Sequence, residues 1–417
     1  MRSKKPAIGF IFLTLMLDVI GFGLIIPVAP KLIETLQPGG EQAAAGTVGL
    51  LAASYAAMQF LFAPILGALS DRFGRRPVIL IALFGSGLDY FALALAPTLW
   101  FLFITRAING LSGASMTAAS AYIADITPPE KRAAGFGIIG AAFGLGFILG
   151  PLIGGFLGDI NIHYPFYAAG VLTLLNWLYG FIVLPESLPP EKRGKFSFAR
   201  ANPVGALAGL GRYPLVAGLA AALFLLNLAQ FSLHSTWVLY TSHRYQWTSR
   251  DVGLSLALVG IGAAVVQAGL ARKIIPKLGE RRSLLVGIAI GAFAFLGYGL
   301  ATQGWMIYAV IAVGSLGGIA GPACQALITK SVRSDEQGSI QGALAGLQSV
   351  ANILGPLIGT STFAYFISDR APVNLPGASF LVASLLSVLG FFVAARVLRK
   401  HPHVPEPPPL VPDAPVA

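Results

Sequence analysis

The sequence is dominated by apolar runs of about 20 residues, and this feature restricts the chain to a membrane fold. A helix of that length crosses the ~30 Å hydrocarbon core of a bilayer, where backbone polar groups must be paired within the protein. Only 11% of the residues are charged, whereas soluble domains carry about 25%. We therefore predict an all-α integral membrane protein with twelve transmembrane helices. The runs lie at residues 7–29, 46–69, 77–96, 99–123, 133–158, 164–184, 213–241, 251–275, 283–301, 304–329, 338–367 and 377–397.

An internal repeat divides the chain into two related halves. The string ILGPLIG occurs at residues 148–154 and again at 353–359, an offset of 205 in a chain of 417 residues. Self-similarity at a fixed offset indicates duplicated units, so we expect two six-helix bundles related by a pseudo-twofold axis. The predicted limits are an N-terminal bundle at 1–185, a cytoplasmic linker at 186–212, a C-terminal bundle at 213–400 and a disordered proline-rich tail at 401–417.

The basic residues lie mostly on one side of the predicted topology. If the N-terminus is cytoplasmic, the cytoplasmic loops and both tails hold 23 of the 28 Lys and Arg residues, as the positive-inside rule requires. This placement accounts for the net charge of +11 without a nucleic-acid partner. The first span contains Asp18 and is too long for a signal-peptide core. We predict a multi-pass protein of a bacterial cytoplasmic (inner) membrane with both termini cytoplasmic.

Three ionisable residues lie deep inside predicted spans of the first half, namely Asp18, Asp89 and Arg106. Such a side chain costs roughly 2.5–3.5 kcal/mol to insert, so it is expected to face a cavity or a partner. Asp89 and Arg106 both lie about seven residues from the same membrane face, and pairing would lower the cost of burying either charge. We interpret all three as candidates for proton coupling. An ion pair that only holds the helices together is the alternative.

The loop between the second and third spans has the sequence GALSDRFGRRP, residues 67–77. It resembles the signature G-x-L-x-D-R-x-G-R-R of the major facilitator superfamily, in which this loop steadies the outward-open state. A glycine permits the tight turn, and the arginines can pair with acids on neighbouring helix ends. Simple anchoring by positive charge is the alternative. The residues assigned to gating and charge relay are Gly67, Asp71, Arg72, Gly74, Arg75, Arg76 and Asp125, the last being the nearest candidate acid.

The fifth span carries a glycine at every fourth position, close to one face of a helix. Small residues at this spacing let a second helix pack backbone to backbone, and the proline permits a kink. The string G-x-x-x-G-P-x-x-G-G resembles the motif of the drug/proton antiporter branch of the superfamily. We interpret the motif as a close-packed gate element beside the proton-handling half. Its residues are Gly146, Gly150, Pro151, Gly154 and Gly155.

Over nearly its full length the chain resembles the tetracycline/proton antiporters, on segments that include residues 17–30, 106–115 and 184–187. Two positions depart from that family. Gly291 stands where the family has an acidic residue that participates in proton coupling and in binding the metal–tetracycline chelate, and Ala263 stands where it has a histidine. We therefore leave the exported drug open. The resemblance implies importance for export at Asp18, Gln59, Asp71, Asp89, Arg106 and Asp125.

These features predict a proton-coupled secondary active efflux transporter, a drug/H+ antiporter that exports a lipophilic small molecule by alternating access. We expect a monomer in the lipid bilayer that is driven by the proton gradient and needs no cofactor, metal or nucleic acid. Arg106 also begins the family pattern R-x-x-[QN]-G, which the resemblance links to proton translocation. The predicted substrate cavity is lined by Tyr55, Gln59, Asn227, Gln230, His234, Gln325, Gln348 and Asn352.

Other functions remain open at this point. A proton-coupled symporter or facilitator for a nutrient could also use Asp18, although the motif of the fifth span favours antiport. A membrane-embedded enzyme would need clustered catalytic side chains, and one cysteine with five dispersed histidines does not supply such a cluster. A receptor without transport activity has no supporting feature in the sequence.

Overall fold

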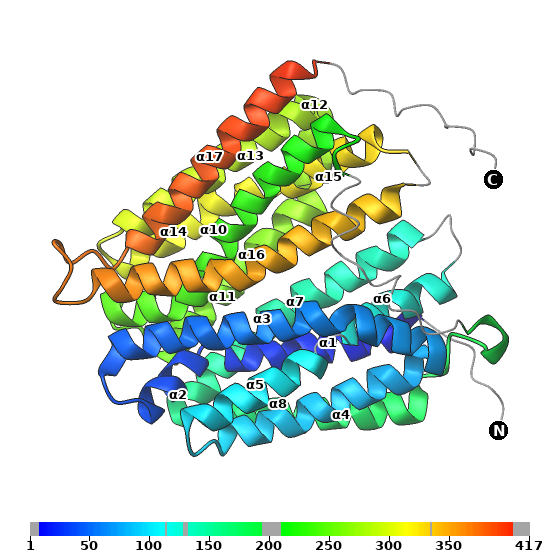
Figure 1. The fold of residues 1–417 in the computed structure, drawn as a ribbon. Helices are drawn as coiled ribbons and strands as arrows, with labels where there is room; N and C mark the ends of the chain where they lie inside the picture. The colour runs from blue at the N-terminus through cyan, green and yellow to red at the C-terminus, as the bar shows by residue number, and fades with distance from the viewer. Residues whose placement is uncertain (1–7, 113–114, 128–131, 194–209, 334–335, 403–417) are drawn as a thin grey trace.

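The computed structural model describes residues 8–112, 115–127, 132–193, 210–333 and 336–402 (Figure 1). These residues are almost entirely helical and contain no strand, as expected for an all-α membrane fold. Most of the predicted linker and tail lies outside the described residues. The first half comprises α1 (Ile8–Ile25), α2 (Ala29–Leu36), α3 (Gly40–Phe73), α4 (Arg75–Ala94), α5 (Leu99–Ser112), α6 (Ser115–Ile126), α7 (Arg132–Ile160) and α8 (Tyr164–Val183), followed by the short 3-10 helix η2 (Pro190–Lys192).

The second half follows the same plan, with two of its spans interrupted by irregular turns. A π-helix, η4, separates α11 from α12, and a 3-10 helix, η5, separates α14 from α15. The two irregular segments contact each other. The helices are α10 (Pro214–Tyr245), α11 (Ser249–Ala264), η4 (Val265–Leu270), α12 (Ala271–Leu278), α13 (Glu280–Leu300), α14 (Gly304–Gly314), η5 (Ser315–Ile319), α15 (Ala320–Ser331), α16 (Gln337–Phe366) and α17 (Ala378–Lys400).

The number of spans is close to the twelve predicted. Among the described residues, ten helices or continuous helical segments are long and apolar enough to cross a bilayer, and the bent pair of α1 with α2 makes eleven. The remaining predicted span, residues 99–123, is covered by α5 and α6. Residues 113 and 114 between these two helices lie outside the described residues. The structure is therefore consistent with twelve crossings without fixing that number.

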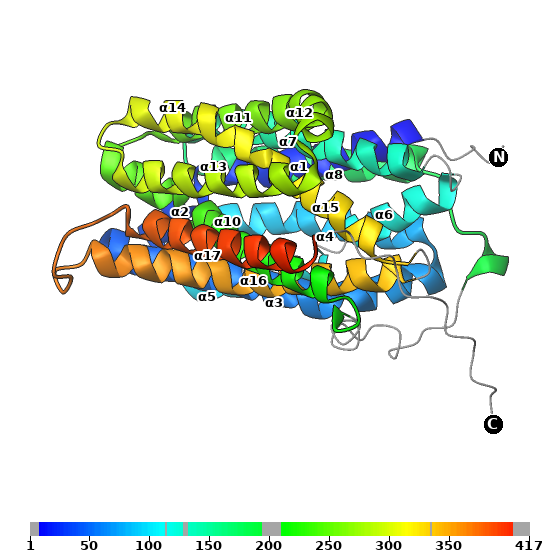
Figure 2. The ribbon, with the colours of Figure 1, turned by 90° about the horizontal axis from the view of Figure 1, so that it is seen from above.

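The two halves repeat the same set of helix contacts. In the first half α1 packs against α7 and α8, and α4 packs against α8. In the second half α10 packs against α16 and α17, and α13 packs against α17. Between the halves, α7 contacts α11 and α3 contacts α16, so the second helix of each half meets the fifth helix of the other. Figure 2 shows these pairs from above. The arrangement has the pseudo-twofold symmetry that the repeat predicts.

The halves meet at one end of the molecule and separate toward the other. In Figure 1, α3 and α16 lie side by side near α2 and diverge toward the end where α1 begins and α17 ends. We call the diverging end the open end and the opposite end the closed end. Polar contacts between the halves lie at the closed end. Nδ1 of His243 is 2.6 Å from Oε2 of Glu41, and Oγ1 of Thr248 donates to Oδ2 of Asp159 at 3.0 Å.

The glycines of α7 bring its backbone against helices on two sides. A Cβ on Gly150 would lie 2.7 Å from Cα of Gly23 and 2.8 Å from the carbonyl oxygen of Ile20, both on α1. A Cβ on Gly155 would lie 2.5 Å from the carbonyl oxygen of Ser249 on α11. Gly146 and Gly154 extend the face toward α1, and Gly158 faces Val28, just before α2, and Ser249. The motif therefore forms a seam that joins α7 to α1 within the first half and to α11 of the second half.

The repeated motif in α16 forms a looser version of this seam. Gly355 and Gly359 pack against α10, as Gly150 and Gly154 pack against α1. Thr360 replaces the glycine that faces the other half, and its side chain lies against Gly49 of α3. The Thr360 side chain fits between the two helices because Gly49 on α3 has no side chain.

Substitution of Gly150 by Ala is expected to lower stability and transport. The added Cβ meets backbone atoms that cannot move aside, so the helices must separate, and overpacking of this kind costs about 1–3 kcal/mol. Gly144→Ala on the same helix is the matched control for stability, because a Cβ there meets no atom within 4 Å. Thermal unfolding in detergent, with transport in cells, measures both variants. Equal stability of the two proteins would contradict the close packing of this seam.

Candidate functional site

The three intramembrane charges come from three packed helices of the first half. Asp18 lies on α1, Asp89 on α4 and Arg106 on α5. α1 meets α4 beside these residues: a Cβ on Gly21, one turn after Asp18, would lie 3.7 Å from Cε2 of Tyr90, the neighbour of Asp89. Asp89 is buried, and its Oδ2 accepts a hydrogen bond from Nδ2 of the buried Asn109 at 2.5 Å. The first half therefore gathers two acids and one guanidinium at membrane depth.

The direct partner of Asp89 differs from the one expected from depth. The ion pairs within 4.0 Å among the described residues do not include Asp89 with Arg106. The Arg106 guanidinium instead lies over the ring of Tyr55 on α3, 6.0 Å from its centroid, within range of a cation–π interaction. Asn109 is one turn further along α5 and reaches α4. Equal depth does not determine which neighbouring helix a side chain faces.

A glycine sets the approach of α5 to α3. A Cβ on Gly110 would lie 2.7 Å from Cβ of Met58 and 2.8 Å from the carbonyl oxygen of Tyr55. The same Cβ would be 3.4 Å from the backbone nitrogen of Gln59, so the two backbones touch at this turn. This contact places the Arg106 guanidinium, one turn earlier on α5, over the Tyr55 ring.

The residues predicted to line the substrate cavity come from helices of both halves. Gln230 and His234 on α10 are joined by a contact of 2.9 Å between their Nε2 atoms. Their side chains are exposed, as are those of Gln325 on α15 and Gln348 on α16. Because an exposed amide in hydrocarbon is costly, these groups are expected to face a polar space rather than lipid. Half-buried positions are held by Tyr55, Gln59, Asn227 and Asn352.

Two glycine faces line open space toward the open end. On α7, Cβ atoms added at Gly137, Gly140 and Gly144 would meet no atom within 4 Å. On α16, the same holds for Gly338, Gly342 and Gly346. In each helix the glycines nearer the closed end are tightly packed. The glycine faces of these two helices therefore lose their packing partners toward the open end, in agreement with the divergence in Figure 1, while Ala142 and Ala343 on the same stretches stay buried.

The loop that joins α3 to α4 lies at the open end and is held by one buried arginine. Nη1 of Arg75 is 2.6 Å from Oδ1 of Asp71 and donates to Oγ of Ser70 at 2.5 Å. Nε of Arg75 donates to Oδ2 of Asp125, at the end of α6, at 3.1 Å. The expected pair of Arg75 with Asp125 is thus present. Gly74 makes the turn with φ of 106°, a conformation that favours glycine.

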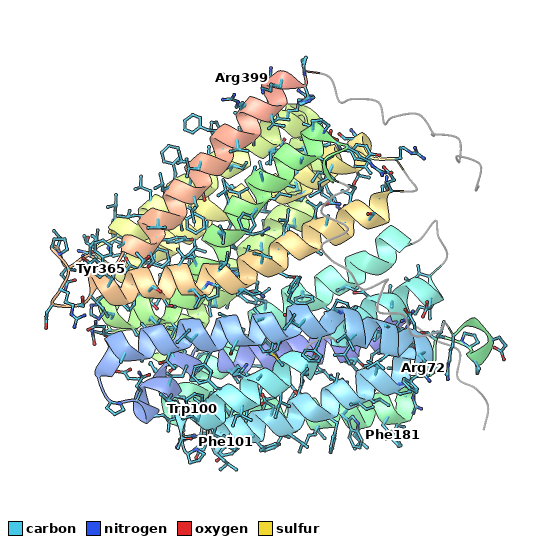
Figure 3. The ribbon with its side chains drawn as sticks, viewed as in Figure 1. Arg72, Trp100, Phe101, Phe181, Tyr365 and Arg399 are labelled. Carbon is cyan, nitrogen blue, oxygen red and sulfur yellow. The ribbon has the colours of Figure 1, made fainter. Side chains whose placement is uncertain are left out.

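The neighbouring loop residues have different surroundings. Nη2 of Arg76 donates to the carbonyl oxygen of Phe181 at 2.6 Å near the end of α8, so its partner is a carbonyl rather than the expected acid. The Arg72 side chain is exposed at the open end (Figure 3). Gly67 lies on α3, where an added Cβ would be 3.6 Å from the Thr117 methyl of α6.

The acid that completes this network, Glu186, was not among the predicted site residues. Its Oε1 accepts hydrogen bonds from the backbone nitrogens of Arg75 at 2.9 Å, Ser187 at 3.0 Å and Leu188 at 3.1 Å. Oγ of Ser187 also donates to Oδ2 of Asp125 at 3.0 Å. The segment after α8 is thereby tied to the α3–α4 loop. The LPES string at residues 184–187 was the available signal, but its sequence alone does not reveal this partner.

The loop between α12 and α13 in the second half is equivalent to the α3–α4 loop, and its ion pair has the charges reversed. Residues 205 positions after Gly74, Arg75 and Asp125 are Gly279, Glu280 and Lys330. Gly279 has φ of 78°, and Nζ of Lys330 lies 2.6 Å from Oε1 of Glu280. The duplicated turn therefore keeps its ion pair while each position carries the opposite sign.

One arginine near each of these two loops has the same kind of hydrogen-bond partner in both halves. Arg281 corresponds to Arg76 in the repeat. Arg281 donates through Nη1 to the carbonyl oxygen of Leu398 at 3.0 Å and through Nη2 to that of His401. In both halves this arginine therefore binds carbonyl groups near the end of the last helix, α8 or α17.

The described residues do not contain a group of three or more His, Cys, Asp or Glu side chains suited to hold a metal ion. The cysteine, Cys324, is buried in the apolar core between α10, α13 and α15. The residues that meet at membrane depth are suited to move a proton and to form hydrogen bonds with a solute.

Comparisons with known proteins agree on the family. The model of the Major Facilitator Superfamily matches residues 11–356. The class C tetracycline resistance protein of Escherichia coli is 41% identical over 87% of this chain and 91% of its own length. The class D protein of Salmonella ordonez is 38% identical over 96% and 98%. Among solved structures, the human organic anion transporter MFSD10 (TETRAN) has a TM-score of 0.68 and 27% identity, covering 93% of this chain and 98% of that chain.

Loss of Arg75 is expected to reduce stability far more than loss of Lys330. Arg75→Ala leaves Asp125, which is 22% exposed, without its cation, and loss of such a charged hydrogen bond costs about 1–3 kcal/mol. The Lys330 side chain is 60% exposed, and an exposed pair contributes about 0–1 kcal/mol. Lys330→Ala is the matched control, because it breaks the equivalent pair of the repeat. Thermal unfolding in detergent measures both. Equal losses would show that the buried network at Arg75 adds no more stability than the exposed pair of Lys330 with Glu280.

Proposed function

The chain belongs to the Major Facilitator Superfamily and is a transporter rather than an enzyme, and on this premise we propose that it exports a lipophilic small molecule in exchange for protons. The observation that carries the proposal is the convergence of Asp18, Asp89 and Arg106 in one half of a two-half helical fold. Intramembrane charges of this kind mark proton relays. Relatives named tetracycline resistance proteins, at 38–41% identity, support drug export over nutrient uptake.

The proposed cycle alternates access between the two ends of the molecule. In the described conformation, the pairs Glu41–His243 and Asp159–Thr248 join the halves at the closed end. The open end is the cytoplasmic end in this proposal, because the basic loops gather there, so this conformation would take up its solute from the cytoplasm or the inner leaflet. To release the solute outside, the contacts at the closed end must break and the faces of α7 and α16 must approach each other.

We assign the coupling of proton and solute movement to competition between protonation of Asp18 or Asp89 and binding of the solute. Protonation of Asp18 or Asp89 from outside would displace the solute, and release of that proton inside would reset the carrier. Arg106 would hold the charge balance of the site through both steps. One charge that moves through 100 mV provides about 2.3 kcal/mol, which sustains roughly a fifty-fold gradient at ~1.4 kcal/mol per decade.

Removal of either acid is expected to abolish substrate-driven proton movement. Asp18→Asn and Asp89→Asn keep the shape of the side chain but cannot exchange a proton. Purified protein in liposomes with a pH-sensitive dye inside measures proton flux when substrate is added. Asp369→Asn, in the exposed loop between α16 and α17, removes one carboxylate elsewhere and should keep full flux.

Two outcomes would overturn the proposal. Undiminished flux in both acid variants would show that protons move by another route. Substrate and protons that move in the same direction across the wild-type membrane would identify a symporter.

The Gly291 position is expected to decide how the chain handles tetracycline. A Cβ at Gly291 meets no atom within 4 Å, so Gly291→Asp has room to place an acid on α13. We expect this variant to raise magnesium-dependent tetracycline resistance in a pump-deficient host above that of the wild type. Gly291→Ala is the control, since it adds the Cβ without the carboxylate. An equal response of both variants, with and without magnesium, would exclude this role.

A further inference from the structure

Five basic side chains surround one cavity at the open end, on the surface between α13 and α17. The cavity has a volume of about 730 Å³. Its lining includes no carboxylate. Figure 3 shows one member, Arg399, at the last turn of α17. The basic residues are Arg281, Arg282, Arg396, Arg399 and Lys400.

The charges converge because two helix ends distant in sequence lie together. Arg281 and Arg282 belong to the first turn of α13, and the other three belong to the end of α17. Arg281 is fixed by the carbonyl oxygens of Leu398 and His401, and neither partner neutralises its charge. Arg282, Arg396 and Arg399 are exposed. The nearby acid Glu280 is engaged by Lys330.

An apolar groove continues from this cavity along the two helices toward the closed end. Phe391 and Phe392 line both the basic cavity and the adjoining groove of about 270 Å³. Phe293 and Phe392 are 73% and 63% exposed. The hydroxyl of Ser384 in this groove already donates to the carbonyl oxygen of Ala292. The groove therefore presents hydrocarbon to its occupant.

Among the described residues, the corresponding place in the first half is arranged differently. Arg76, the counterpart of Arg281, lies over the ring of Phe181 and donates to its carbonyl oxygen. After the end of α8 the chain continues with Leu184, Pro185 and the acid Glu186. In the part of the chain that the structure describes, the arginine of the first half is thus covered by an aromatic ring and followed by an acid, unlike its counterpart in the second half.

We propose that this site binds an anionic phospholipid, with its phosphate headgroup among the five basic side chains and an acyl chain along the apolar groove. Guanidinium groups match phosphate oxygens in geometry and charge, and basic pockets between helices at the cytoplasmic face select anionic headgroups. A phosphate group joined to hydrocarbon satisfies the basic cavity and the groove together. This inference goes beyond the export function and involves none of the residues assigned to it.

The lipid is expected to stay bound to the purified full-length protein and to stabilise it. Native mass spectrometry and thermal unfolding in detergent are compared for added phosphatidylglycerol, cardiolipin, phosphatidylcholine and inorganic phosphate. Retention and stabilisation should be found with the two anionic lipids. Equal effects of phosphatidylcholine would refute the headgroup selectivity, and an equal effect of inorganic phosphate would refute a lipid occupant.

A charge-matched pair of variants tests the location. Arg282→Gln/Arg396→Gln/Arg399→Gln should lower anionic-lipid retention about tenfold or more, since each basic residue adds to the attraction. Arg272→Gln/Lys273→Gln/Lys277→Gln removes the same charge from the exposed side of α12 and should leave retention unchanged. All six side chains are exposed, and unfolding without lipid checks that both variants fold. The same loss in both variants, or in neither, would overturn the proposal.

Discussion

The architecture depends on the backbone contact that α7 makes on two sides. Gly150 meets Gly23 of α1, while Gly155 meets Ser249 of α11 in the other half. α7 therefore packs inside its own bundle and also forms part of the contact between the two bundles. At these two contacts no side chain separates the backbones, so a movement of the halves must slide or tilt along them. The equivalent seam at α16 carries Thr360 and is less tight.

The sequence was most informative where one residue type recurs with a helical period or at a fixed offset. Runs of apolar residues predicted the helices, and the offset of 205 predicted matching halves, because both patterns report backbone geometry directly. The same reason explains the turn at Gly74 and the packing of Gly150. Two predicted spans of the second half are interrupted by η4 and η5, and apolarity alone gave no sign of these interruptions.

Side-chain partners were harder to predict, since they depend on rotation about each helix axis and on loop paths. Asp89 and Arg106 share a depth, yet Asp89 bonds to Asn109 and Arg106 faces another helix. Glu186 follows α8 at a distance of more than a hundred residues from the loop it binds. A sequence reveals that such charges need partners, but the partner is selected by three-dimensional neighbours that no local pattern encodes.

The reversed ion pair of the second half has a consequence for how duplicated transporters diverge. The attraction between two charges depends on their product, so both signs can change while the contact and the turn are kept. Arg75 with Asp125 and Glu280 with Lys330 are such a pair of solutions. A search of the two halves for identical residues scores these positions as lost. At these positions the relation between the halves is seen in two substitutions that compensate each other. It becomes visible only when both members of each ion pair are compared together.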